Sequence, residues 1–207
     1  MRHPLLCLPL FCVLCVLFLS SCEEVKEPSI YDNWKERNQA VADSLFSASS
    51  GFFCTEGAEV DSVPVNQTFA IPTAASTNKK MAYVFCKKIS RNIEAERPYY
   101  TDYVSVHYCG SDINGKVFDK SFNGYTFIDR SYSPDALLPT VFDKPIYGFP
   151  TDFVEGWTTA LQYMREGERW MIYVPYESGY GEKDYSSILG YSLLTFDIIL
   201  EGVETEH

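Results

Sequence analysis

Hydrophobic residues recur at every second position in several short runs of the C-terminal part of the chain. A period of two places those side chains on one face of an extended strand. The pattern predicts strands over residues 82–89, 102–109, 116–121, 168–175 and 193–201. The Asn114-Gly115 pair between the second and third runs is the dipeptide that favours a tight hairpin turn.

Before the last two predicted strands, Trp157, Leu161 and Met164 are spaced by four and then three residues. This is the spacing of a hydrophobic stripe along one side of a helix, and it predicts a short helix that ends at Gly167. A run of strands with one helical segment indicates an α+β domain, in which an antiparallel sheet carries a helix on one face.

The part of the chain before residue 80 has weaker patterns. Residues 34–47 carry hydrophobic side chains at near-helical spacing, and Asn33 with Glu36 three residues later predicts a capping box at the start of a helix. Residues 47–78 are rich in Ser, Thr, Ala, Gly and Pro, and they keep no period for more than a few positions. They are therefore predicted to be irregular.

The chain begins with a segment of a different kind. A short basic start precedes an almost wholly hydrophobic run over residues 5–19, which ends in small residues that lead to Cys22. This resembles a bacterial lipoprotein signal, in which residues 1–21 are removed and Cys22 becomes the lipidated first residue. A transmembrane anchor or a buried helix is the alternative, but the run is shorter than the roughly 20 residues needed to span a membrane.

The charge balance limits the classes of partner. The chain has 17 Lys and Arg against 28 Asp and Glu, which gives a formal net charge of −11, and it contains no basic stripe. A surface of this charge argues against binding to nucleic acid. With 207 residues, 46% of them hydrophobic, the chain can bury one sizeable core.

The cysteines and histidines form no catalytic or metal-binding motif. After the signal segment and Cys22, the cysteines that remain are Cys54, Cys86 and Cys109, so at least one thiol cannot pair within the chain. We expect buried free thiols, with a Cys54–Cys86 disulfide as the alternative. One of the three histidines lies in the signal segment and another ends the chain, so no hydrolase triad is expected.

Five motifs follow one another within residues 82–203. They are Val-His-Tyr-x-Gly (106–110), Asn-Gly-Lys-x-Phe-Asp-x-Ser (114–121), Glu-Gly-Trp (155–157), Pro-x-x-x-x-Tyr-Gly (175–181) and Leu-x-Phe-Asp-Ile-x-Leu (194–200). Together they resemble the FKBP family of peptidyl-prolyl cis-trans isomerases, here in a bacterial lipoprotein form. The resemblance implies a twisted, half-open antiparallel β-sheet wrapped around a short α-helix, with an N-terminal helical extension and a hydrophobic pocket.

The resemblance also divides the chain and assigns its site. It implies a signal peptide at 1–21, a linker with a helical and irregular extension at 22–80, and an isomerase domain at 81–207. The residues implied to be catalytic are Tyr108, Asp119 and Tyr180. The residues implied to bind substrate are Phe118, Ile146, Phe153, Val154, Trp157, Ile188 and Phe196.

The implied function is isomerisation of the peptide bond before proline in exported polypeptides, with no cofactor and no metal. A macrolide inhibitor is expected to fit the pocket. Cys22 would anchor the protein in the bacterial cell envelope, facing the periplasm or the cell surface. The alternative is a catalytically weak, FKBP-like binding or chaperone module with the same anchor. Residues 120–143 form a longer connection than in compact family members, and this insertion is expected to border the pocket rim.

Overall fold

We obtained a computed structural model of the chain, which describes residues 29–77, 80–126 and 142–205. The chain divides into two compact units, Met1–Asp32 and Asn33–His207. Only residues 29–32 of the first unit are described, so the predicted signal segment and Cys22 lie outside the described residues. The fold below is that of the second unit.

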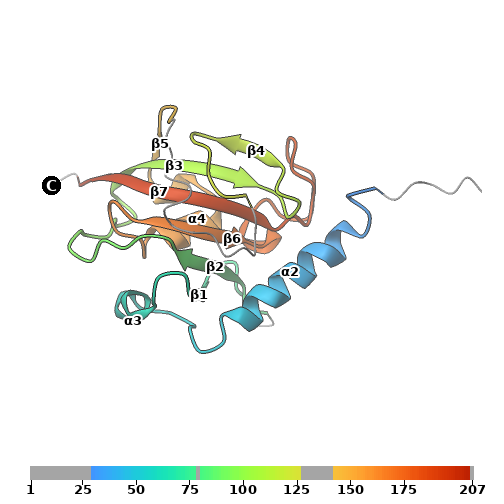
Figure 1. Cartoon of the computed structure of the whole chain (residues 1–207), viewed down its shortest axis with the longest axis horizontal. Coiled ribbons are helices and arrows are strands. Elements are labelled where there is room, and N and C mark those ends of the chain that lie inside the picture. Colours follow the sequence, from blue (N-terminus) through green and yellow to red (C-terminus); the bar gives the residue numbers. More distant parts are fainter. Residues whose placement is uncertain (1–28, 78–79, 127–141, 206–207) are drawn as a thin grey trace, which may run out of the picture. The chain divides into compact units, whose positions relative to one another are not determined.

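Seven strands form one antiparallel sheet (Figure 1). The strands are β1 (Thr68–Pro72), β2 (Tyr83–Lys88), β3 (Tyr103–Ser111), β4 (Val117–Lys120), β5 (Ile146–Gly148), β6 (Arg169–Val174) and β7 (Leu194–Glu204). Their order is β1-β2-β6-β7-β3-β4, and β5 pairs with β3. The five strands predicted from the sequence are confirmed as β2, β3, β4, β6 and β7.

Three α-helices accompany the sheet within the described residues: α2 (Trp34–Ala48), α3 (Gly57–Ser62) and α4 (Glu155–Leu161). α4 is the predicted short helix, but the prediction that it ends at Gly167 is wrong. The helix stops at Leu161, and Gly167, with a φ of 80°, forms the turn into β6. There its N–H donates a hydrogen bond to the Leu200 carbonyl oxygen at 2.7 Å.

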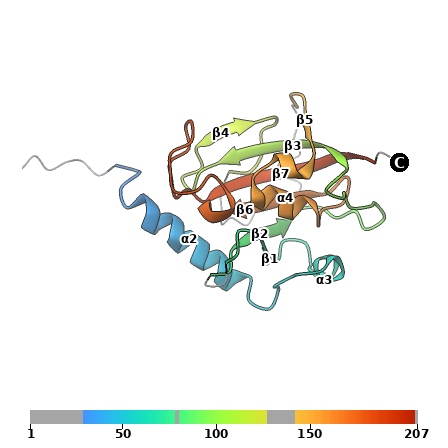
Figure 2. The ribbon, with the colours of Figure 1, turned by 180° about the vertical axis from the view of Figure 1, so that it is seen from behind.

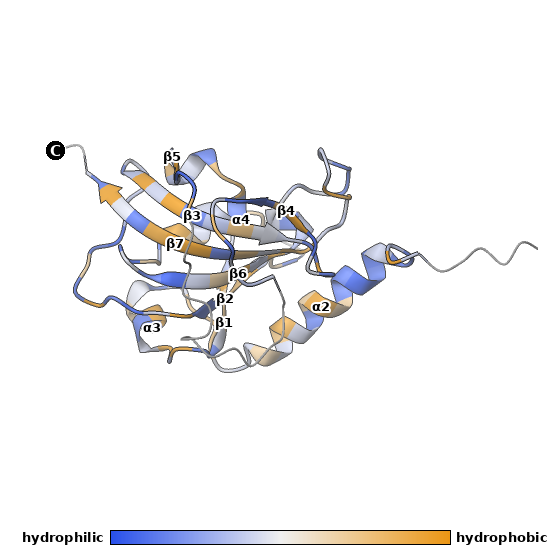
Figure 3. Cartoon of the chain, turned by 45° about the horizontal axis from the view of Figure 1, so that its top comes forward, coloured by the Kyte–Doolittle hydropathy of each residue, from blue (hydrophilic) through white to orange (hydrophobic). Residues whose placement is uncertain are grey.

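α4 packs on one face of the sheet, as Figure 2 shows from behind. Its Trp157 and Leu161 join a buried cluster with alternate residues of the central strands, among them Ile172 of β6 and Ile198 of β7. Hydrophobic residues accordingly gather along β7 in Figure 3. The predicted helix on one face of an antiparallel sheet is confirmed.

The opposite face is also covered, by α2. Leu45 of α2 belongs to a second buried cluster with Phe85, Met171 and Tyr173, whose side chains alternate with those of the first cluster. Every residue of β6 is therefore buried. The predicted helix over residues 34–47 is confirmed, and its hydrophobic side packs on the protein's own sheet. Residues 33–80 thus share one compact unit with the rest of the sheet and α4.

The predicted irregular stretch at 47–78 is wrong, because it contains α3 and β1. β1 pairs with β2 from Thr68↔Lys87 to Pro72↔Tyr83, and its first four residues are all buried. Phe69 faces the α4 side and Ala70 the α2 side. Only the three residues 69–71 are hydrophobic between Thr68 and Pro72, and so short a run does not identify a strand in a sequence.

The start of α2 also differs from the prediction. Asn33 precedes the helix with a left-handed backbone, at a φ of 53°, and its side chain makes no capping hydrogen bond. The Asn33 carbonyl oxygen instead accepts the Arg37 N–H at 2.9 Å. The predicted capping box with Glu36 is therefore wrong, because an N-cap side chain caps from an extended backbone.

Cys54, Cys86 and Cys109 are buried free thiols, as expected. Burial raises the pKa of the Cys86 thiol well above its ordinary value. Cys54 and Cys86 lie in the same hydrophobic cluster without forming a bond, so the alternative of a Cys54–Cys86 disulfide is wrong.

The two described ends of the insertion at 120–143 lie next to each other. Phe122 and Phe142 form an isolated antiparallel bridge, with ring centroids 5.8 Å apart. The Phe142 ring also packs against His107 at 4.7 Å, and His107 alternates along β3 with Tyr108, which faces the other way. These ends therefore leave the sheet on the side away from Tyr108, although the insertion was expected at the pocket rim; residues 127–141 lie outside the described residues.

Candidate functional site

A cavity of about 260 Å³ opens where the start of α4 meets the β3–β4 pair and the connection between β6 and β7. Its lining residues are Tyr108, Phe118, Asp119, Ile146, Asp152, Phe153, Val154, Trp157, Tyr180, Tyr185 and Phe196. Apart from Ile188, all of the site residues predicted from the sequence within the domain line this one cavity. Residues separated by up to half the chain are thus brought together by the sheet and α4.

Trp157 forms the floor of the cavity from the first turn of α4. It is only 4% exposed, and its ring lies 5.5 Å from that of Tyr108, 5.2 Å from that of Phe153 and 5.2 Å from that of Phe196. The indole N–H is buried and finds no hydrogen-bond acceptor among the described residues. The floor is therefore hydrophobic, and the Trp157 indole N–H is its one hydrogen-bond donor without an acceptor among the described residues.

Gly110 allows the two phenylalanines of the wall to pack closely. Phe118 and Phe196 meet edge to face, with ring centroids 5.6 Å apart. A Cβ atom at residue 110 would lie 2.7 Å from Phe118 Cζ and 2.9 Å from Phe196 Cε1, closer than packed carbon atoms approach. A side chain at this position would displace the wall.

Tyr108 and Asp119 are joined across the β3–β4 pair. The Tyr108 hydroxyl donates a hydrogen bond to Asp119 Oδ2 at 2.5 Å. Burial raises the pKa of Tyr108, and the hydrogen bond to Asp119 and the charge of that carboxylate raise it further. Tyr108 therefore stays protonated well above neutral pH, and the hydroxyl has a fixed direction because its proton points to Asp119.

The rim of the cavity carries two tyrosines of the β6–β7 connection. Tyr180 and Tyr185 stack with ring centroids 4.6 Å apart, and burial raises the pKa of the Tyr180 hydroxyl. Within the described part of the chain, neither the Tyr180 hydroxyl nor the Val154 N–H has a hydrogen-bond partner. Two donors at the edge of a hydrophobic cavity are thus free to bind a ligand.

Ile188, which was predicted to bind substrate, does not line the cavity. It is 9% exposed and packs in the α4-side cluster. A tight turn through Ser186, at a φ of 52°, pairs Ile188 with Tyr185 by two backbone hydrogen bonds of 2.9 Å. The turn directs Ile188 into the core and presents Tyr185 at the rim.

Asp152 and Tyr185 are the lining residues that the sequence analysis missed. Asp152 Oδ2 accepts the Phe149 N–H at 2.8 Å, which shapes the turn that leads into α4. The second aromatic residue shortly after Tyr180 was a signal for Tyr185, whereas no sequence signal distinguished Asp152.

The described residues hold no group of three His, Cys, Asp or Glu side chains arranged as metal ligands. Among residues 29–77, 80–126 and 142–205, no helix is long and hydrophobic enough to cross a membrane. His107 is buried on the face of β3 away from Tyr108, as predicted, and its Nδ1 lies 3.2 Å from Ser121 Oγ.

Comparison with known proteins yields relatives that match about half of the chain. The chain is 33% identical over 119 residues to the macrophage infectivity potentiator of Trypanosoma cruzi. The aligned region covers 57% of this chain and 52% of that protein. It is 35% identical over 108 residues to the FKBP-type 22 kDa peptidyl-prolyl cis-trans isomerase of Escherichia coli, covering 52% of this chain and 44% of that protein. The chain spans about half the length of these relatives.

A solved structure of a peptidyl-prolyl cis-trans isomerase from Pseudomonas syringae aligns with 81% of this chain and 96% of that chain, at 19% identity and a TM-score of 0.48. The sequence profile described as "FKBP-type peptidyl-prolyl cis-trans isomerase" matches residues 94–201. This match includes the strands β3 to β6, α4, most of β7 and all residues that line the cavity. Since it covers more than half of the chain, the protein belongs to the family of FKBP-type peptidyl-prolyl cis-trans isomerases.

Proposed function

We propose that this protein is a peptidyl-prolyl cis-trans isomerase that assists the folding of exported polypeptides. The observation that carries the proposal is a hydrophobic cavity, floored by Trp157, that has two unused donors at its rim. Family membership supports the same reaction.

The reaction lowers a rotational barrier and breaks no covalent bond. Amide resonance sets that barrier at about 18–20 kcal/mol, while the two isomers of a bond before proline differ by only about 0.5–1 kcal/mol. A twisted amide has less charge separation than a planar one. A hydrophobic cavity therefore disfavours the planar ground state more than the twisted transition state.

Seven of the lining residues have a role in this scheme. The rings of Phe118, Trp157 and Phe196 surround the proline and exclude water. The Val154 N–H and the Tyr180 hydroxyl donate hydrogen bonds to carbonyl oxygens of the substrate. Asp119 holds the Tyr108 hydroxyl in one direction and thereby sets the polarity beside the twisting carbonyl group.

The walls of the cavity also include Ile146 of β5 and Phe153, which precedes α4. The pocket offers several ring faces and few charges, which suits a proline ring and also suits a macrolide inhibitor. Such an inhibitor would compete with the substrate for the same walls.

The proposed place of action is the bacterial cell envelope. The hydrophobic N-terminal run that leads to Cys22 supports a lipid anchor on that cysteine. Cells grown with a labelled fatty acid should incorporate the label into the wild-type protein and not into Cys22→Ala. A wild-type protein without label would contradict the anchor.

The activity is tested by adding the purified protein to a short proline peptide and measuring the cis-to-trans rate with and without a macrolide. We expect acceleration that the macrolide abolishes. A rate equal to that of buffer, together with stoichiometric capture of one partner, would instead support the alternative of an FKBP-like binding module.

A further inference from the structure

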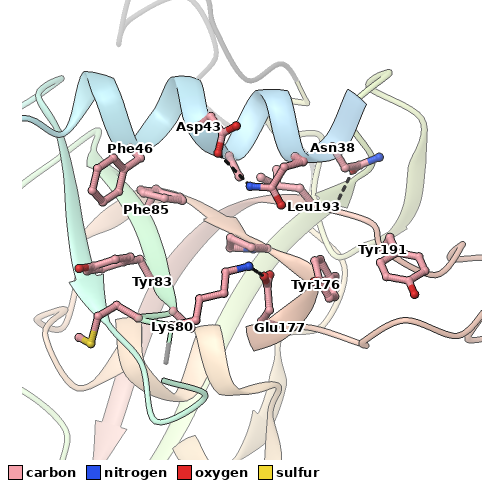
Figure 4. A pocket seen from close by; sticks show the side chains of 15 residues that line it. Asn38, Asp43, Phe46, Lys80, Tyr83, Phe85, Tyr176, Glu177, Tyr191 and Leu193 are labelled. Atoms are coloured by element: carbon pink, nitrogen blue, oxygen red, sulfur yellow. Dashed lines mark hydrogen bonds and ion pairs between the residues drawn. The ribbon is translucent and has the colours of Figure 1, made fainter. Parts of the chain in front are cut away.

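The connection between β6 and β7, residues 175–193, borders two cavities. Tyr180 and Tyr185 line the proposed substrate cavity, whereas Tyr176 and Tyr191, nearer the two ends of the connection, line a second cavity of about 150 Å³ beside α2. Figure 4 shows this second cavity with α2 above it. We call residues 175–193 the β6–β7 loop. The conformation of this loop decides where the two rim tyrosines lie.

Asn38 of α2 holds the end of this loop. Its side chain is buried at 3% exposure, and its Oδ1 accepts a hydrogen bond from the Leu193 N–H at 2.7 Å, drawn as a dashed line in Figure 4. Its Nδ2 donates to the Trp34 carbonyl oxygen at 2.7 Å, which orients the amide. A buried amide with both groups paired defines one geometry, and loss of either partner would be costly.

A second hydrogen bond of α2 reaches the residue beside Leu193. The Trp34 indole Nε1–H donates to Ser192 Oγ at 3.1 Å, and the Ser192 hydroxyl donates to the Leu189 carbonyl oxygen at 2.6 Å. The first turns of α2 therefore fix two consecutive residues of the loop.

A third contact leads from α2 to Tyr180. The Lys35 ammonium lies 4.0 Å from the centre of the Tyr191 ring. The Tyr191 N–H, in a residue with a left-handed φ of 61°, donates to the carbonyl oxygen of Gly181 at 3.0 Å. Gly181 directly follows Tyr180, so one side chain and one backbone hydrogen bond separate α2 from the rim of the substrate cavity.

We propose that Asn38 is a positioning residue, through which α2 holds the β6–β7 loop in the conformation that presents Tyr180 and Tyr185 to the substrate. α2 lies outside residues 94–201, the segment that matches the family profile. The predicted effect of Asn38 on substrate binding rests on the proposed isomerase function. The predicted ordering of the β6–β7 loop by Asn38 does not depend on that function.

The test compares two substitutions in α2 of the purified full chain. Asn38→Ala removes the acceptor of the Leu193 N–H, whereas Leu45→Ala removes a buried hydrophobic side chain of the same helix, two turns further on, that makes no hydrogen bond with the loop. Hydrogen exchange is measured at the Tyr191 and Leu193 amides, with the Met171 amide of β6 as the internal reference. Asn38→Ala should speed loop exchange at least tenfold relative to that reference, and Leu45→Ala should not.

Steady-state kinetics on a proline peptide give the second measurement. Asn38→Ala should raise KM about fivefold and lower kcat less, because the loop must be ordered before it binds substrate. Trp34→Phe, which keeps an aromatic ring but loses the indole N–H donor, should show a smaller change in the same direction. The proposal would be overturned if Asn38→Ala and Leu45→Ala changed hydrogen exchange in the loop, relative to the Met171 amide, by the same factor. It would also be overturned if Asn38→Ala had no effect on that exchange. If the wild-type protein showed no isomerisation, the proposed function would fail while hydrogen exchange still decided the role of Asn38.

Discussion

The Tyr108 hydroxyl donates a hydrogen bond to Asp119 Oδ2 at 2.5 Å, from one strand of a hairpin to the next. Both side chains line a cavity whose floor and walls are otherwise mainly aromatic. In the proposed mechanism this carboxylate needs neither a nucleophile nor a metal beside it, because it orients the Tyr108 hydroxyl. This relationship leads to the first prediction.

Asp119→Ala and Tyr108→Phe should each reduce kcat/KM for a proline peptide by about tenfold, which corresponds to about 1.4 kcal/mol of transition-state stabilisation. Because both substitutions remove the same hydrogen bond, the double variant should lose little more than either single variant. Fully additive losses in this double-mutant cycle would show that the two residues act separately.

The raised pKa of Tyr108 predicts how the activity depends on pH. Burial first, and then the hydrogen bond to Asp119, stabilises the neutral hydroxyl, so it should remain protonated above the ordinary tyrosine value of about 10. We therefore expect kcat/KM to stay constant from pH 7 to 10. Tyrosine-labelled NMR should show Tyr108 titrating last, and at lower pH in Asp119→Ala; a Tyr108 titration at the ordinary value would contradict this prediction.

Gly110→Ala should damage the pocket more than the fold. The added Cβ would contact Phe118 and Phe196, and the rings must move because both contacts are shorter than 3.0 Å. We expect substrate affinity to fall at least fivefold, with a change in the near-ultraviolet circular dichroism of the aromatic side chains. Gly51→Ala is a control for substrate affinity only: nothing lies within 4 Å of the Cβ site there, but the φ of 91° makes any side chain strained. It should lower stability and leave substrate affinity unchanged. Unchanged affinity in Gly110→Ala would show that the wall does not need this close packing.

A buried ion pair joins β6 to β7 on the α2 side of the sheet. Arg169 Nε donates to Asp197 Oδ1 at 2.8 Å, its Nη2 donates to Oδ2 at 2.6 Å, and the Tyr125 N–H donates to the same Oδ2 at 2.7 Å. Arg169→Met would leave the Asp197 carboxylate buried without its counter-ion. The free energy of unfolding in urea should fall by about 3–5 kcal/mol.

The double variant Arg169→Met with Asp197→Leu is the control for this pair. It removes both charges, and it should recover part of the stability lost in Arg169→Met. A loss below 1 kcal/mol in Arg169→Met would show that the carboxylate finds another partner.

The sequence predicted the strands that have one face on the α4 side because their hydrophobic residues alternate clearly, as Leu194, Phe196 and Ile198 do in β7. β1 was missed because it is short: only Phe69, Ala70 and Ile71 are hydrophobic, and Thr68 and Pro72 flank them. The role of α2 could not be read from residues 34–47 either, since an amphipathic pattern predicts that a helix packs without identifying its partner surface.

The residues that line the cavity could largely be identified from the sequence, because the aromatic residues Phe118, Trp157 and Phe196 lie in recognisable motifs. Ile188 and Tyr185 show where sequence reasoning failed. The turn at Ser186, whose backbone is left-handed, determines which of the two side chains reaches the cavity. A serine in a sequence does not indicate a left-handed backbone.

The most direct test of the proposed activity is NMR exchange spectroscopy between the cis and trans forms of a short proline peptide with a catalytic amount of the protein. Uncatalysed exchange takes about 10–100 s at 25 °C. We predict that the wild-type protein brings exchange into the range of seconds or less and that Asp119→Ala slows it about tenfold. Exchange at the uncatalysed rate with folded wild-type protein would contradict the proposed isomerase function.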